Sequence, residues 1–202
     1  MTTPSTFRIP AATLDGPGGR LVAALARRTY GQVPDTVRVW WHHRPLVRAL
    51  LRLERAVARF DELDAHLKAY AVMASAASIG CSWCLDFGYY LAHHDGLDEA
   101  TVREVPRWRD SDAFTDLERD VMGYAEAMTA TPPTVTDEMV AGLIEQLGVP
   151  AVVELTQMVA LENMRSRVNA TAGLTSQGFS DVCELPLAAA RPPAPAAVPS
   201  AG

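Results

Sequence analysis

The segment Cys81-Ser82-Trp83-Cys84 is the part of this sequence with the clearest capacity for chemistry. Gly80 directly precedes it, and the segments on both sides have the composition of helices. Because glycine often ends a helix, we expect Cys81 to begin the next one, where free backbone N–H groups and the helix dipole favour a thiolate. Residues three positions apart lie on one face of a helix, so the sulfurs can form a disulfide or bind a metal. The pair is therefore predicted to be a redox centre.

Composition limits the classes of protein to consider. The chain has 202 residues, 49% of them apolar, which is enough for one domain with a substantial core. The net charge of −6 and the absence of a basic run argue against binding to nucleic acid. We find neither a signal-peptide pattern nor an apolar run long enough to span a membrane, so a cytoplasmic protein is expected. In that compartment a Cys-x-x-Cys pair is more often catalytic or metal-binding than structural.

Hydrophobic spacing predicts an all-α fold, because no segment alternates with the period of a strand and no hairpin signal is present. We expect a single-domain helical bundle over residues 19–185, between a flexible arm (1–18) and a disordered Ala/Pro-rich tail (186–202). Pro45 is expected to break or kink one long segment. The predicted helical segments are 21–30, 37–60, 63–79, 82–94, 98–108, 115–128, 136–148 and 150–172.

The sequence from Leu67 to Gly96 resembles the carboxymuconolactone decarboxylase and alkylhydroperoxidase AhpD-like superfamily. The resemblance rests on the stretch AASIGCSWC at 76–84, an apolar helix that ends in HHDG at 93–96, and the later segments 114–119, 124–129 and 154–169. It extends over most of residues 35–185. The resemblance implies an all-helical protomer that assembles into trimers, hexamers or dimers.

In the peroxidase branch of that superfamily, a Glu twelve residues before the first cysteine and a His four residues after the second relay a proton from one thiol. The thiolate then reduces a peroxide, and the cysteines close to a disulfide. Here Cys81 and Cys84 match the redox pair, but the two relay positions hold Ala69 and Gly88. Neither residue can transfer a proton. The resemblance thus implies a redox pair without the family's relay.

Other residues are candidates to replace the missing Glu and His of the proton relay. His66, fifteen residues before Cys81, is the leading substitute base, although a histidine at such a place is often only a surface residue. Trp83 is expected to shield the disulfide or to contact a substrate, with core packing as the alternative. Asp86 is expected to turn away from the sulfurs, and Glu118 to close a capping box with Thr115.

One late helical segment is unusually polar for its apolar content. We interpret its polar residues as ion-pairing groups within the bundle or between protomers, with a site-lining role as the alternative. These residues are Glu162, Asn163, Arg165, Arg167 and Asn169.

Three functions remain open at this stage. The first is an alkylhydroperoxidase-like thiol oxidoreductase, in which Cys81 and Cys84 are catalytic and act on a small peroxide or a dithiol or disulfide partner. The second is a lyase or decarboxylase that acts on a small carbonyl compound. The third is a non-enzymatic, oligomeric scaffold that responds to redox state. No cofactor is expected. No metal is expected either, because two cysteines supply only half of a tetrahedral zinc site and Cys183 and His66 would have to fold onto it.

Overall fold

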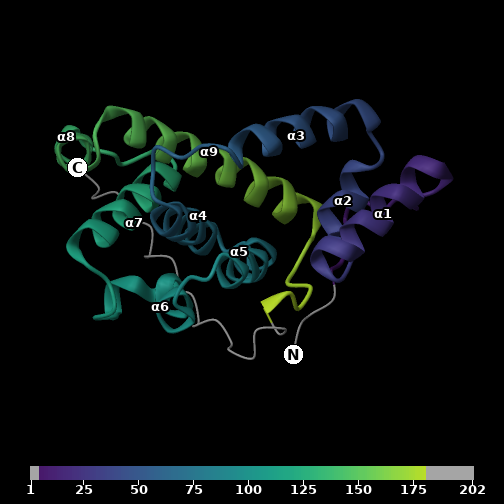
Figure 1. Ribbon diagram of the computed structural model, residues 1–202, viewed down its shortest axis with the longest axis horizontal. Helices are drawn as coiled ribbons and strands as arrows, with labels where there is room; N and C mark the ends of the chain where they lie inside the picture. Colours follow the sequence, from purple (N-terminus) through teal and green to yellow (C-terminus); the bar gives the residue numbers. More distant parts are fainter. Residues whose placement is uncertain (1–4, 181–202) are drawn as a thin grey trace, which may run out of the picture.

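The computed structural model describes residues 5–180, and the regular secondary structure in this part of the chain is all helical, with no strand (Figure 1). The all-α prediction is therefore confirmed. The predicted tail at 186–202 and Cys183 lie outside the described residues. The helices are α1 (Gly16–Tyr30), α2 (Asp35–Trp40), α3 (Arg44–Val57), α4 (Ala65–Ile79), α5 (Ser82–His94), α6 (Glu99–Glu104), the 3-10 helix η1 (Val105–Asp110), α7 (Asp116–Thr129), α8 (Asp137–Leu147) and α9 (Val149–Ala172).

Helix α4 forms the centre of the bundle and packs against α5, α7 and α9 (Figure 1). It is rich in alanine, which favours helix and lets neighbouring backbones approach closely. Ala71, Ala74 and Ala76 have no exposed surface. Apolar side chains surround it on both sides, in one cluster with α5 and in a second with α7, α8 and α9. The helix that precedes the thiols is thus held rigidly in the core.

Helix α9 is the longest helix and packs against both α4 and α5. Pro150 lies in its first turn, where a missing N–H leaves no hydrogen bond unmade. Gly173 ends α9 in the left-handed region, with φ of 74°. A Cβ at this position would clash with the side chain of Thr6. This helix brings residues from late in the sequence to the thiol helix.

The segment predicted as one helix at 37–60 is divided into α2 and α3. The chain turns at residues 41–43, and Pro45 lies in the first turn of α3. His43 makes the new start possible, because its Nδ1 accepts the backbone N–H of Leu46 at 3.0 Å. The expected break near Pro45 is confirmed, but it falls before the proline rather than at it.

The N-terminal segment packs against the end of α9, and the start of α7 matches its prediction. Helix α1 begins within the predicted arm, at Gly16, and Thr6 donates its backbone N–H to the carbonyl of Gly173 at 2.9 Å. The capping box of Thr115 and Glu118 at the start of α7 is present as predicted. Among the helices described, none has the length and apolar character that crossing a membrane requires.

Candidate redox site

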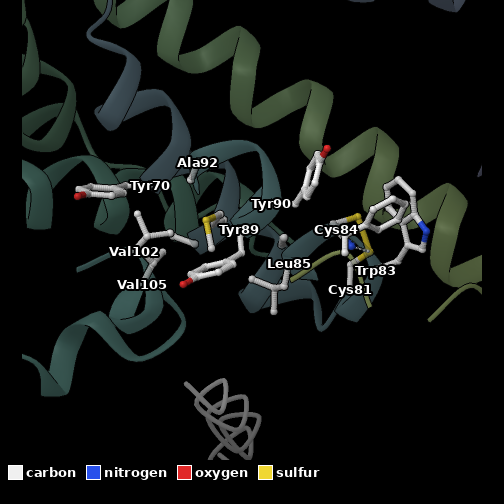
Figure 2. Close-up of a cluster of buried hydrophobic side chains, with 14 of the residues drawn as sticks. Tyr70, Cys81, Trp83, Cys84, Leu85, Tyr89, Tyr90, Ala92, Val102 and Val105 are labelled. Atoms are coloured by element: carbon white, nitrogen blue, oxygen red, sulfur yellow. Dashed lines mark hydrogen bonds between the residues drawn. A yellow bond between two sulfur atoms is a disulfide. The ribbon is translucent and has the colours of Figure 1, made fainter. Parts of the chain in front are cut away.

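The two thiols lie at the junction of α4 and α5, where local sequence determines their geometry. Gly80 ends α4 with φ of 82°, and Cys81 is the N-cap residue of α5. The backbone N–H of Cys84 donates to the Cys81 sulfur at 3.2 Å. Cys81 and Cys84 form a disulfide with a Cα–Cα distance of 5.3 Å, drawn as the yellow bond in Figure 2. The predicted pairing of two sulfurs at a helix start is therefore what the structure contains.

Helix α9 supplies the polar groups around Cys84. The hydroxyl of Ser166 and the side-chain amide of Asn169 each lie 3.3 Å from the Cys84 sulfur. The amide donates to the sulfur, whereas the single hydrogen of the hydroxyl can go either to the sulfur or to the carboxyl of Glu162. The orientation of Asn169 is fixed from α2, because Thr36 donates its hydroxyl to the amide oxygen at 2.9 Å. Donors of this kind stabilise negative charge on sulfur when the disulfide is reduced. Cys84 therefore has a prepared thiolate environment.

A buried carboxyl lies directly behind Ser166. Glu162 Oε1 is 2.6 Å from the Ser166 hydroxyl, and only 3% of the residue is exposed. Burial raises the pKa of Glu162 from 4.5 to about 7, against the lowering effect of the hydrogen bond from Ser166 and the charge of Arg165. Glu162 thus changes its protonation state near neutral pH, one hydroxyl away from a redox-active sulfur.

Arg165 holds the outer side of this carboxyl. Its Nη1 is 3.6 Å from Glu162 Oε2, while Nε and Nη2 make a bidentate pair with Glu54 of α3, at 3.0 and 2.6 Å. Burial lowers the pKa of Arg165, but the two carboxylates outweigh burial and the pKa is raised. The predicted ion pairing of Arg165 within the bundle is confirmed. Glu162 also forms the predicted ion pair, with Arg165, and at the same time lies beside Ser166 at the site. For Asn169, which contacts the Cys84 sulfur, the alternative interpretation as a site-lining residue agrees with the geometry.

The two positions that hold the relay residues in the family, 69 and 88, carry small residues in this chain. Gly88 stands four residues after Cys84, and a Cβ added there would lie 3.1 Å from the Met73 side chain of α4. A histidine at this position would require Met73 to move. Ala69, at the other relay position, carries no proton-transferring group. The polar groups near Cys84 come instead from α9.

His66 is not brought to the thiols. It lies in the first turn of α4, whereas the thiols follow the last turn of this fifteen-residue helix. At about 1.5 Å per residue the separation along the helix axis is about 20 Å. Its Nε2 lies 3.7 Å from Glu118, and its ring packs edge-on against Tyr70. These contacts give His66 a place in the bundle far from the sulfurs.

Trp83 is buried beside the disulfide (Figure 2). Its ring stacks on Phe87 with a centroid distance of 5.1 Å and meets Phe179 edge-on at 6.1 Å. Its indole N–H donates to Gln177 at 2.8 Å. These contacts are those of a core residue, so core packing, the alternative given in the sequence analysis, describes Trp83. A role of Trp83 in substrate binding stays a prediction.

Asp86 holds a C-terminal segment over the thiol helix. Its carboxylate is 2% exposed and accepts four backbone N–H groups, from residues 177–180, at 2.6 to 3.0 Å. As predicted, Asp86 is turned away from the sulfurs: its carboxylate hydrogen-bonds the backbone of residues 177–180, and its role is to fix this segment. The segment carries Gln177 and Phe179, the two partners of Trp83.

Sequence reasoning missed Ser166 and the grouping to which it belongs. Glu162, Ser166 and Asn169 are separated by four and then three residues, so they lie on one face of α9. A polar stripe at this spacing on an otherwise apolar helix was the available signal. Within residues 5–180, no three side chains of His, Cys, Asp or Glu gather in a way that would hold a metal ion.

Comparison with known proteins agrees with the family resemblance and with this fold. The sequence model of the carboxymuconolactone decarboxylase family matches residues 44–127. The uncharacterized protein YnjA of Escherichia coli (strain K12) is 32% identical over 170 residues, which cover 81% of this chain and 89% of YnjA.

Two solved structures have the same fold. An uncharacterized peroxidase-related protein with an alkylhydroperoxidase AhpD core, from Ralstonia eutropha JMP134, has a TM-score of 0.76 at 15% identity and covers 91% of this chain and 98% of its own. A cysteine-to-alanine variant of the debrominase Bmp8, in complex with 2,3,4-tribromopyrrole, also has a TM-score of 0.76, at 18% identity, over 88% and 96% of the two chains.

Proposed function

Because this chain belongs to the carboxymuconolactone decarboxylase family, and because its thiols form a disulfide at a helix start, we propose that it is a thiol oxidoreductase that reduces small hydroperoxides. The observation that carries the proposal is the position of Cys84 Sγ between two hydrogen-bond donors of α9, Ser166 and Asn169. A structural disulfide needs no such donors. A sulfur that becomes a thiolate does, because they stabilise its charge.

The proposed reaction balances with the two thiols as the source of electrons. A thiolate attacks the terminal oxygen of the hydroperoxide, the O–O bond breaks, and the departing alkoxide takes a proton to become an alcohol. The attacking cysteine is then a sulfenic acid. The second thiol attacks its sulfur, the disulfide forms, and water leaves. An external dithiol then reduces the disulfide by thiol–disulfide exchange and is itself oxidised.

Burial of the pair supports a small substrate. Cys81 is 4% exposed and Cys84 is 6% exposed, with Trp83 and the segment held by Asp86 packed nearby. A small hydroperoxide needs only a narrow opening to reach such a sulfur. A bulky disulfide partner needs the covering segment to move first. The same surroundings exclude water, which strengthens the effect of nearby dipoles on a thiolate.

The test is single-turnover oxidation of the reduced protein by hydrogen peroxide and by an organic hydroperoxide, followed by mass spectrometry of the Cys81–Cys84 peptide. We expect one equivalent of peroxide to be consumed per disulfide formed. Cys81→Ser and Cys84→Ser each abolish disulfide formation between the pair, whereas Cys183→Ser is the matched control and leaves it intact. Peroxide consumption that is equal in all three variants would contradict the proposal.

We further propose that the protein assembles with copies of itself through the leucine side chains that α3 leaves exposed. Leu46, Leu51 and Leu53 are 41%, 42% and 37% exposed, which is unusual for three leucines of one helix. Within residues 5–180, only Val47 and Val57 of this helix are buried. Multi-angle light scattering tests the assembly, and a monomer at micromolar concentration would contradict it.

A further inference from the structure

We propose that Glu162 is the acid–base group of this site and that it exchanges a proton with the Cys84 thiol through the hydroxyl of Ser166. The inference rests on the thiol chemistry proposed above and identifies the residues that replace the family's missing relay. It depends on three atoms in a row: Cys84 Sγ, Ser166 Oγ at 3.3 Å from it, and Glu162 Oε1 at 2.6 Å from that oxygen.

The three atoms, Cys84 Sγ, Ser166 Oγ and Glu162 Oε1, can pass a proton from one end to the other. A serine hydroxyl has one hydrogen, and Ser166 Oγ lies within hydrogen-bonding distance of two groups that can accept it. If Glu162 is ionised, Ser166 donates to the carboxylate and is free to accept the proton of the Cys84 thiol. If Glu162 is protonated, it donates to Ser166, which then donates to the Cys84 thiolate. Both arrangements satisfy every polar atom, and they differ only in the position of the proton.

Burial of Ser166 and Glu162 favours direct proton exchange between Glu162 and Cys84. Ser166 has no exposed surface and Glu162 is 3% exposed, so water does not compete for their hydrogen bonds. The row carries the same single negative charge before and after transfer. Arg165 Nη1, 3.6 Å from Glu162 Oε2, supplies a positive charge close to it. The other charged group on this side is Glu54, which is already paired with Arg165.

The remaining contacts define the roles of the neighbours. Asn169 donates an amide N–H to the Cys84 sulfur, but the amide does not ionise, so Asn169 is a positioning residue that stabilises the thiolate. The Cys81 sulfur accepts the backbone N–H of Cys84, and within residues 5–180 no side-chain hydrogen bond links it to a carboxyl. We therefore assign Cys84 as the cysteine that attacks the hydroperoxide, and Cys81 as the one that closes the disulfide.

In the complete reaction, Glu162 takes the proton of the Cys84 thiol before attack. The thiolate then breaks the O–O bond, and the proton held by Glu162 is available through Ser166 to the departing alkoxide. A general acid–base group whose pKa lies near the working pH is well suited to both steps. Burial raises the pKa of Glu162 to about 7, so both of its forms are populated at neutral pH.

The experiment compares Glu162→Gln and Ser166→Ala with the parent protein in a Cys81→Ser, Cys183→Ser background, where Cys84 is the one remaining thiol. The first readout is the rate of alkylation of Cys84 by iodoacetamide as a function of pH. Two groups that share a proton titrate in two steps that belong to the pair. We expect two steps in the parent and a single step in Glu162→Gln. Glu145→Gln, an exposed glutamate of α8, is the matched control and keeps both steps.

The second readout is the rate of disulfide formation with hydrogen peroxide in proteins that retain both cysteines. We expect Glu162→Gln and Ser166→Ala to slow it roughly 100-fold at neutral pH, the ordinary effect of removing a general base. Two-step alkylation with no peroxide reaction in the parent would overturn the peroxidase function and leave the proton exchange standing. A fast peroxide reaction with unchanged alkylation profiles in both variants would overturn the proton exchange and leave the peroxidase function standing.

Discussion

Replacing Glu162 by Gln is expected to change how the stability of the disulfide form depends on pH. The carboxyl is buried, and its pKa in the folded protein is raised from 4.5 to about 7. Glutamine has nearly the same shape, never ionises, and still accepts the hydroxyl of Ser166 through its amide oxygen. The comparison therefore isolates the ionisation of a single group. In the disulfide form neither Cys81 nor Cys84 titrates.

The free energy of unfolding depends on pH because the folded and unfolded chains release the proton of Glu162 at different pH values. Below pH 4.5 the carboxyl is protonated in both states, and Glu162 carries no penalty of ionisation. Between pH 4.5 and 7 the unfolded chain ionises while the folded protein does not, so the free energy of unfolding falls as pH rises. At about 1.4 kcal/mol for each tenfold change in proton affinity, the total loss is about 3 kcal/mol.

Urea unfolding under non-reducing conditions measures this effect. The free energy of unfolding of the parent protein minus that of Glu162→Gln is expected to decrease by about 3 kcal/mol between pH 4.5 and 7, and to be constant above this range. Glu145→Gln corrects for the loss of one carboxylate at an exposed position. A difference that is independent of pH would refute the reasoning, because it would mean that Glu162 titrates alike in the folded and unfolded chains.

Three further outcomes follow from the contacts of individual side chains. Thr36→Val removes the hydroxyl that orients Asn169, so we expect a loss of about 1 kcal/mol of stability and slower oxidation of Cys84, measured by urea unfolding and by single-turnover kinetics. Asp86→Asn places an amide N–H₂ among four backbone N–H donors, and we expect a loss of roughly 3 kcal/mol and a red shift of tryptophan fluorescence as Trp83 becomes hydrated. Leu51→Glu, at one of the exposed leucines of α3, is expected to lower the molar mass measured by light scattering, and an unchanged mass would place the contact between copies elsewhere.

Much of the thiol junction follows from neighbouring residues in the sequence. Gly80 has no Cβ to oppose a positive φ, so it ends α4 and places Cys81 at the N-cap of α5. Thr115 and Glu118 form their capping box within four residues, and the prediction needed nothing more distant. Such features depend on contacts that span one helical turn. The pattern of apolar residues likewise gives the helices and their approximate ends.

The source of the polar groups at Cys84 could not be read in the same way. Ser166 and Cys84 are separated by 82 positions and meet because α9 packs against α5. The stripe of Glu162, Ser166 and Asn169 can be recognised on one helix face, but the sequence does not state which helix that face meets. The choice of His66 as a base relied on its distance along the chain, whereas α4 runs straight and keeps it one helix length from the sulfurs.

The chemistry of Cys81 and Cys84 is tested most directly by thiol titration with mass spectrometry, before and after one equivalent of hydroperoxide. The structure holds the pair as a disulfide in which Cys84 contacts Ser166 and Asn169. We expect the reduced protein to lose two thiols rapidly, to yield a Cys81–Cys84 disulfide, and to regain both thiols when an external dithiol is added. Thiols that remain unreacted toward hydroperoxide, or a disulfide that resists the dithiol, would contradict a catalytic role and would leave the pair as a structural cross-link.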